Sequence, residues 1–176
     1  MNRRGTILGA AAVVVALVVA LAVGLAAMKT RAVRAPAADE YAKWDAKTNT
    51  ATLELVAGPF IFNDASQGPA GFTIPGNANV VINFVNKDGT PHSAEVISGE
   101  EPIPNQAVDP AIPRAYTKKL QEGMAQEDTD VMTFTVPDSG RYRIICGVPG
   151  HAISGMWLWL VVDPAAKTTT FGAMGN

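Results

Sequence analysis

The chain has 176 residues, with 14 Lys or Arg against 16 Asp or Glu, so its formal net charge is −2 at pH 7. Without a basic excess, the composition argues against nucleic acid as a partner, and the single cysteine excludes an intramolecular disulfide framework. The length fits one domain of about 100 to 150 residues with appended segments.

The N-terminus is predicted to be a membrane anchor, residues 1–28. Positions 5–28 form an uncharged run rich in Ala, Val and Leu, longer than the roughly 20 residues that span a bilayer as a helix. A cleaved signal peptide has a shorter apolar region of about 7 to 15 residues. Small residues around 25–27 keep that alternative open. Basic residues stand on both sides of the run, so the positive-inside rule does not fix the orientation.

The segments that flank the main body carry weak signals. Residues 29–49 mix Ala, Pro and charged residues and are expected to form a tether that lets an anchored domain reach partners. A helical turn is expected at 39–44. Residues 166–176 are expected to be a frayed tail.

Residues 50–165 are interpreted as one domain of short strands separated by Gly, Pro, Asn and Asp turns. The predicted strands are 50–57, 60–63, 72–75, 79–86, 93–97, 131–136, 141–146 and 156–162. Many short strands without helical periodicity indicate an all-β sandwich.

An excursion at 99–130 interrupts the strand pattern. It contains four prolines and then a polar stretch at 116–127 that is compatible with one helix. The plain interpretation is a solvated surface connection, and the alternative is a segment that contacts a partner.

The residues that carry chemistry lie mainly in one late loop. Cys146, His151 and Met156 follow one another with the spacing C-x4-H-x4-M, and the second of only two histidines, His92, lies far upstream. Two imidazoles, one thiolate and one thioether make up the donor set of a blue-copper site. In the predicted strand 141–146 the thiol shares the apolar face, so it points toward a core.

Other chemistries fit these residues less well. Taken singly, each donor also has an ordinary structural role. Structural zinc requires four Cys or His ligands and the chain has three, while a dinuclear copper loop would need a second cysteine. A Cys–His hydrolase would need a carboxylate or amide to orient the histidine, and the ligand loop has no acidic residue.

The segment 146–157 resembles the copper loop of the sulfocyanin-like blue copper proteins, a cupredoxin family. Residues 83–86, followed by Pro91 and His92, are similar to that family's first-histidine region. Rusticyanin is similar in loop spacing, whereas plastocyanin has a shorter gap between Cys and His. The resemblance covers residues 50–164, without a departure at a ligand position.

The resemblance implies a Greek-key β-sandwich and one type 1 copper ion. It implies His92, Cys146 and His151 as equatorial ligands and Met156 as the weak axial ligand. The implied activity is non-enzymatic: a membrane-tethered carrier that passes single electrons between respiratory-chain components, such as an oxidase or a cytochrome complex. The copper domain is then expected on the extracytoplasmic side.

Three other functions stay open from the residues alone. These are copper storage or delivery without electron transfer, a copper enzyme, and a metal-free adhesion or sensor sandwich. If electrons are transferred, we expect them to pass at the ring edge of His151, within an apolar patch that includes Pro149 and Ile153.

Overall fold

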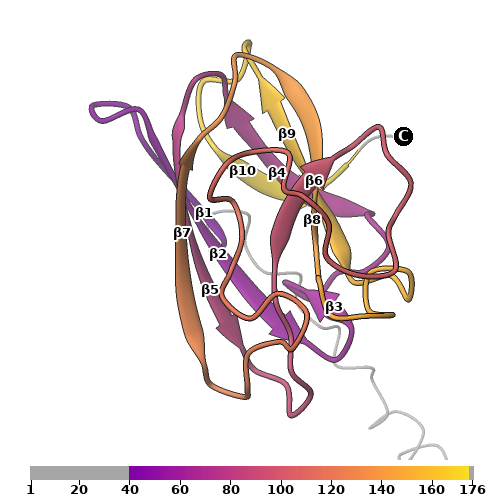
Figure 1. Cartoon of the computed structure of the whole chain (residues 1–176). Coiled ribbons are helices and arrows are strands. Elements are labelled where there is room, and N and C mark those ends of the chain that lie inside the picture. Colours follow the sequence, from indigo (N-terminus) through magenta and orange to yellow (C-terminus); the bar gives the residue numbers. More distant parts are fainter. Residues whose placement is uncertain (1–39, 175–176) are drawn as a thin grey trace, which may run out of the picture. The chain divides into compact units, whose positions relative to one another are not determined.

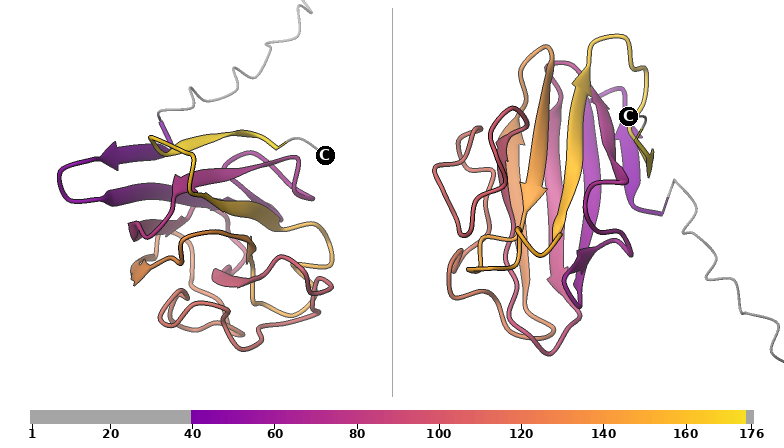
Figure 2. Two further views of the ribbon diagram at one scale, coloured as in Figure 1. Left: turned by 90° about the horizontal axis from the view of Figure 1, so that it is seen from above. Right: turned by 90° about the vertical axis from the view of Figure 1, so that its right-hand side faces the viewer.

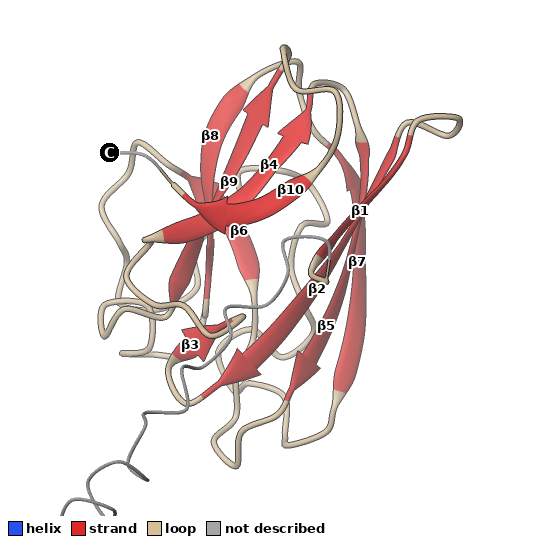
Figure 3. Cartoon of the chain, turned by 180° about the vertical axis from the view of Figure 1, so that it is seen from behind, coloured by secondary structure: helices blue, strands red, loops and turns tan. Residues whose placement is uncertain are grey.

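The computed structural model describes residues 40–174, which form ten strands in two five-stranded sheets and no helix (Figures 1 and 3). The first sheet contains β1 (Ala42–Asp45), β2 (Thr50–Gly58), β3 (Ile61–Phe62), β5 (Asn79–Asn86) and β7 (Thr129–Thr135). The second contains β4 (Ala70–Pro75), β6 (Glu95–Ser98), β8 (Gly140–Ile145), β9 (Trp157–Asp163) and β10 (Thr170–Ala173).

The strand order is β1-β2-β5-β7 in the first sheet, with β3 paired to β2, and β10-β4-β9-β8-β6 in the second. The pairs β2/β5 and β4/β9 are parallel, and the other pairs are antiparallel. Seen from above, the two sheets form two facing layers (Figure 2). The expectation of an all-β sandwich is confirmed.

The core lies between the sheets, and the period of two places it there. Alternate residues of β2, β5 and β9 are buried. Their side chains meet those of β4 and β8 in one cluster that includes Leu53, Phe84, Phe72 and Leu158, each at most 1% exposed. Each such side chain contributes about 1.5 to 3 kcal/mol on burial. This core fixes the strand ends from which the chemistry-bearing loops leave.

Two edge strands lie outside the span expected for the domain. β1 falls in the expected tether and pairs with β2, so the helical turn at 39–44 is wrong. β10 falls in the expected frayed tail and pairs with β4. Phe171 of β10 is buried, with its ring centroid 4.8 Å from that of Phe72 and 5.1 Å from that of Tyr41. Aromatic packing thus closes this edge of the sandwich.

The excursion at 99–130 is neither helical nor a simple solvated connection. Its residues 116–127 form turns and isolated bridges instead of the expected helix. Backbone hydrogen bonds join residues 115–117 to 94–96, and Met124 forms a reciprocal pair with His92. The segment therefore packs beside β6 (Figure 1), and its Met124 forms an isolated bridge with His92, the first histidine.

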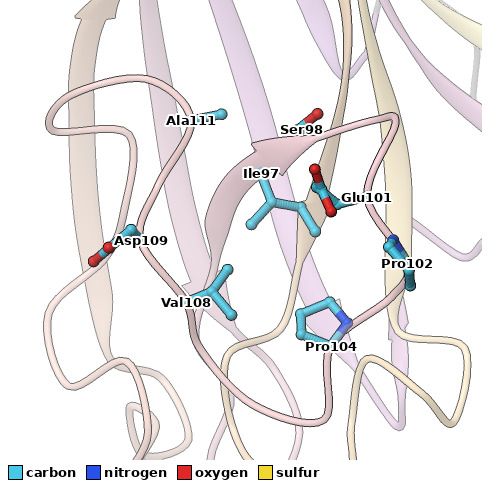
Figure 4. Close-up of a pocket in the computed structure, with 8 residues that line it drawn as sticks. All are labelled: Ile97, Ser98, Glu101, Pro102, Pro104, Val108, Asp109 and Ala111. Carbon is cyan, nitrogen blue, oxygen red and sulfur yellow. The ribbon is translucent and has the colours of Figure 1, made fainter.

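The excursion also borders a shallow hollow at the end of β6 (Figure 4). Ile97, Pro104 and Val108 form part of its apolar wall, and the carboxylates of Glu101 and Asp109 also line it. None of the four predicted metal ligands lines this hollow.

The outer face of β8 and β9 carries two arginines that stack on a tryptophan. The guanidinium of Arg141 lies 4.3 Å from the ring centroid of Trp159, and that of Arg143 lies 4.7 Å from the same ring. Such cation–π contacts contribute about 0.5 to 1 kcal/mol each at exposed sites.

No helix within residues 40–174 has the length and apolar character needed to cross a bilayer. The predicted anchor at 5–28 lies outside the described residues.

Candidate metal centre

Three of the predicted ligands converge at one end of the sandwich. Cys146 follows β8, His151 lies in the loop before β9, and His92 lies between β5 and β6. Cys146 Sγ is 3.5 Å from His151 Nδ1 and 3.9 Å from His92 Nδ1, and the two Nδ1 atoms are 3.1 Å apart. Residues 54 positions apart thus present their donor atoms to one point.

This triangle has the size of a metal site. The point equidistant from its three corners lies about 2 Å from each, close to the bond lengths of about 2.0 to 2.3 Å that nitrogen and sulfur ligands make to divalent metals. His92 and Cys146 are fully buried, and His151 is 8% exposed. The donor atoms therefore fit a single ion that is shielded from water.

Met156 lies at the same end of the core. It is fully buried and belongs to the same cluster as Cys146. Its carbonyl accepts a hydrogen bond from the Cys146 N–H at 3.1 Å, and its N–H donates to the His151 carbonyl at 3.1 Å. The backbone of the loop thus ties the thioether residue to two of the other donors.

The excursion braces this ligand loop. The N–H of Gly150, at φ +85°, donates to the Asn105 carbonyl at 2.7 Å, and Ala107 N–H donates to the Gly147 carbonyl at 2.9 Å. A Cβ on Gly147 would lie 2.9 Å from the Ala107 Cβ, so glycine permits this close approach.

Ser93 links the thiol to both loops. Its N–H points at Cys146 Sγ at 3.4 Å, while its hydroxyl donates to the Leu120 carbonyl and accepts from the Gly147 N–H. Burial raises the pKa of the Cys146 thiol. A bound metal ion opposes this effect because a coordinating thiol is deprotonated, and the Ser93 N–H then stabilises the thiolate.

The electrostatics of His151 suit a metal ligand. Burial, followed by the charge of His92, lowers the pKa of His151. Coordination requires the neutral imidazole, so the folded chain disfavours the protonated form that would compete with a metal ion.

Asp88 supports His92, and the sequence interpretation missed its role. The His92 Nε2 lies 3.0 Å from Asp88 Oδ2, so Nε2–H donates and Nδ1 is free to face the other donors. Asn86 shapes the turn between them: its Oδ1 accepts from the Asp88 N–H, and its Nδ2 donates to the Thr90 and Met124 carbonyls. The i,i+4 spacing of Asp88 and His92 was the available signal.

Phe60 was also missed. It has φ +56° and is 41% exposed, and its ring centroid lies 4.6 Å from that of His151 and 6.1 Å from that of His92. The predicted patch residues Pro149 and Ile153 are exposed, the latter by 59%. Phe60, Pro149 and Ile153 are called the apolar rim below.

A buried carboxyl lies on β6, near the ligand strands. Glu95 is fully buried, its Oε1 accepts from the Val108 N–H at 3.0 Å, and Oε2 has no partner among the described residues. Burial raises the pKa of Glu95 from 4.5 to about 7. The Glu95 carboxyl therefore binds its proton more tightly in the folded state than in the unfolded chain.

Glu95→Gln is expected to stabilise the protein only at higher pH. The contribution of the tightly bound proton is complete below about pH 4.5 and is lost as pH rises through 7. Above pH 7 the free energy of unfolding of the variant should exceed that of the wild type by up to about 3 kcal/mol, since one pKa unit is about 1.4 kcal/mol. Urea unfolding of the copper-free proteins at pH 4 and pH 8 measures this. A gain equal at both pH values, or matched by exposed Glu122→Gln, would contradict it.

Comparisons with known proteins agree with this arrangement. The family model for the sulfocyanin (SoxE) domain matches residues 40–171. A curated sulfocyanin from Sulfolobus acidocaldarius is 28% identical over 113 residues, covering 59% of this chain and 56% of the relative. Auracyanin-B from Chloroflexus aurantiacus is 28% identical over 155 residues, covering 78% and 62%. The chain therefore spans less than two thirds of the length of these curated relatives.

A solved structure of reduced rusticyanin shows the same kind of fold. It is 25% identical, with a TM-score of 0.51, and the match covers 71% of this chain and 88% of rusticyanin.

Proposed function

The chain belongs to the sulfocyanin family of cupredoxins, and from this premise we propose that it is a membrane-tethered carrier of single electrons. The observation that carries the proposal is the convergence of Cys146, His92 and His151 on one buried point. Its cofactor is one copper ion. Copper bound there supplies one-electron chemistry by alternating between Cu(I) and Cu(II).

In this proposal His92, Cys146 and His151 would hold the copper ion, and the Met156 thioether would be a weaker fourth donor. A soft thiolate and thioether with two imidazoles favour copper over zinc or the hard oxygen-binding cations. The axial ligand and the surrounding apolar shell adjust the reduction potential. The donor types thus select the metal, and the burial of the site adjusts its reduction potential.

The fold also fixes the positions of these donor residues. Both histidine-bearing segments are fixed by backbone hydrogen bonds: His92 to Met124, and the ligand loop to the excursion at 105–107. Ligands that keep their positions while the charge of the ion changes need little rearrangement, and this supports fast electron transfer.

Electrons pass at His151 in this proposal, because it is the most exposed of the four donor residues and its ring packs against Phe60 of the apolar rim. Two copies docked at their rims would exchange electrons with each other. Ile153→Lys is then expected to lower the self-exchange rate about tenfold, which corresponds to a loss of about 1.4 kcal/mol in the free energy of docking. Line broadening in mixtures of the Cu(I) and Cu(II) proteins measures this rate.

Val131→Lys is the matched control, because Val131 is also 59% exposed but lies on β7. Equal rates in both variants would argue against the rim as the docking surface. His151→Gly, loaded with copper and added imidazole, tests the exit route itself. Full exchange in that variant would remove His151 from the route.

The tether and the partners complete the proposal. Residues 5–28 anchor the chain in the cell membrane as a single pass, with the copper domain on the extracytoplasmic side. Its donor and acceptor are respiratory-chain proteins such as an oxidase or a cytochrome complex. The apolar run of 24 residues supports the anchor. Loss of membrane association on deleting 1–28 is the expected result, and a chain that stays bound without it would contradict the anchor.

Voltammetry and a chelator challenge separate this function from copper storage or delivery. A carrier is expected to show a reversible one-electron wave and to retain copper against a chelator for many turnovers. Rapid loss of copper to the chelator, without a reversible wave, would instead support storage or delivery.

A further inference from the structure

Asp88 is placed to do more than close a turn. Its Oδ2 lies 3.0 Å from His92 Nε2, its Oδ1 accepts from the Gly89 N–H at 2.8 Å, and its backbone N–H is held by Asn86. The His92 side chain is fully buried and that of Asp88 is only 17% exposed. This is a fixed, largely dehydrated contact between a carboxylate and one candidate ligand.

The two imidazoles differ in this respect. His92 has an anionic acceptor on the nitrogen remote from the donor triangle. His151 has no hydrogen bond or ion pair from its Nε2 within residues 40–174, and its ring lies against Phe60 instead. An anion that accepts the remote ring proton raises the basicity of the imidazole as a metal ligand and fixes its orientation.

From this asymmetry we propose that Asp88 is a positioning residue that sets the reduction potential through His92, by binding Cu(II) more favourably than Cu(I). The proposal deepens the proposed function and rests on it. A more basic His92 donates more electron density to the metal, and the dicationic ion gains more from this than the monocation does. The negative charge of the Asp88 carboxylate also favours Cu(II) over Cu(I), because solvent screens it only weakly across the buried His92 side chain.

The test is the reduction potential of the copper-loaded chain carrying Asp88→Asn. Second-sphere changes of this kind cost about 10- to 100-fold in metal affinity. We expect at least a tenfold loss for Cu(II) relative to Cu(I), which raises the potential by about 59 mV for one electron. Competition titrations of Cu(I) and Cu(II) should assign the loss to the oxidised ion.

Asp128→Asn is the matched control. It removes the same charge near the same turn, where the Asp128 carbonyl accepts from the Asn86 N–H, without touching His92. A purely structural role predicts that Asp88→Ala lowers both affinities equally and leaves the potential unchanged. Either that pattern, or an Asp88→Asn potential equal to that of Asp128→Asn, would overturn the proposal.

Voltammetry of the wild type distinguishes a failure of electron transfer from a failure of the Asp88 role. If the wild type binds copper but shows no reversible wave, the proposed function fails, although the relative Cu(I) and Cu(II) affinities still test Asp88. If the wild type is reversible and Asp88→Asn does not shift the potential, only the role of Asp88 fails.

Discussion

Cys146→Ser is expected to abolish the intense visible absorption of the copper-loaded protein and its reversible redox cycling. The thiolate is the only sulfur anion available to the site, because the chain has one cysteine. A serine hydroxyl is a harder ligand that stays protonated at neutral pH, so neither the charge-transfer colour nor the affinity for Cu(I) should survive. Visible spectra of both proteins after Cu(II) addition measure the loss.

Met156→Leu is the companion variant, because it conserves volume in the core and removes only the thioether proposed as the weaker fourth donor. It is expected to stay blue and to have a raised reduction potential. Circular dichroism should show the same β-sheet fold in both variants. A Cys146→Ser protein that is folded and still intensely blue would refute the assignment of the thiolate.

Asn86→Ala is expected to give the second largest effect, a loss of about 3 kcal/mol in the free energy of unfolding. The Asn86 side chain is fully buried and makes three hydrogen bonds to backbone groups, to Asp88, Thr90 and Met124. Each contributes about 1 kcal/mol. Alanine leaves the Asp88 N–H and the Thr90 carbonyl without these partners, while the Met124 carbonyl keeps only its bond from the His92 N–H. Urea unfolding at constant pH measures the difference.

Asn83→Ala, on the same strand β5, is the control. Its side chain makes one hydrogen bond, to the half-buried Glu54, so a loss below about 1 kcal/mol is expected. The turn that Asn86 shapes also orients His92, so the Asn86 variant should bind copper more weakly as well. Similar stabilities in the two variants would show that the hydrogen bonds of Asn86 do not stabilise the turn before His92 in the expected way.

The donor set could be predicted from the sequence because it is chemically rare. A chain with two histidines and one cysteine places one of each five residues apart, followed by a methionine after five more. Strands were predictable where burial alternates: β5 has the predicted bounds, 79–86, and β2 differs by one residue at its end.

The rest of the fold depends on contacts that the sequence does not display. β1 and β10 are four residues each, too short to show alternation, and they exist because β2 and β4 offer edges to pair with. The excursion 99–130 has no periodicity, since its order comes from hydrogen bonds to the segments that bear the ligands.

Two site residues were hidden for similar reasons. Phe60 reaches the histidines from a non-glycine position with positive φ, a conformation that side-chain type does not predict. Asp88 precedes His92 by four residues, which normally pairs side chains on a helix, but here the two meet across a turn. Local patterns therefore picked out the donor residues, three of which converge in the structure, and tertiary structure determined what supports and covers them.

The EPR spectrum of the Cu(II)-loaded protein is the decisive measurement of whether this chain holds one thiolate-bound copper ion for electron transfer. We expect one copper ion per chain with narrow hyperfine splitting, because electron density is shared with the Cys146 sulfur, and we expect the signal to disappear with ascorbate. A widely split spectrum of ordinary tetragonal copper, or no stoichiometric binding, would contradict this expectation.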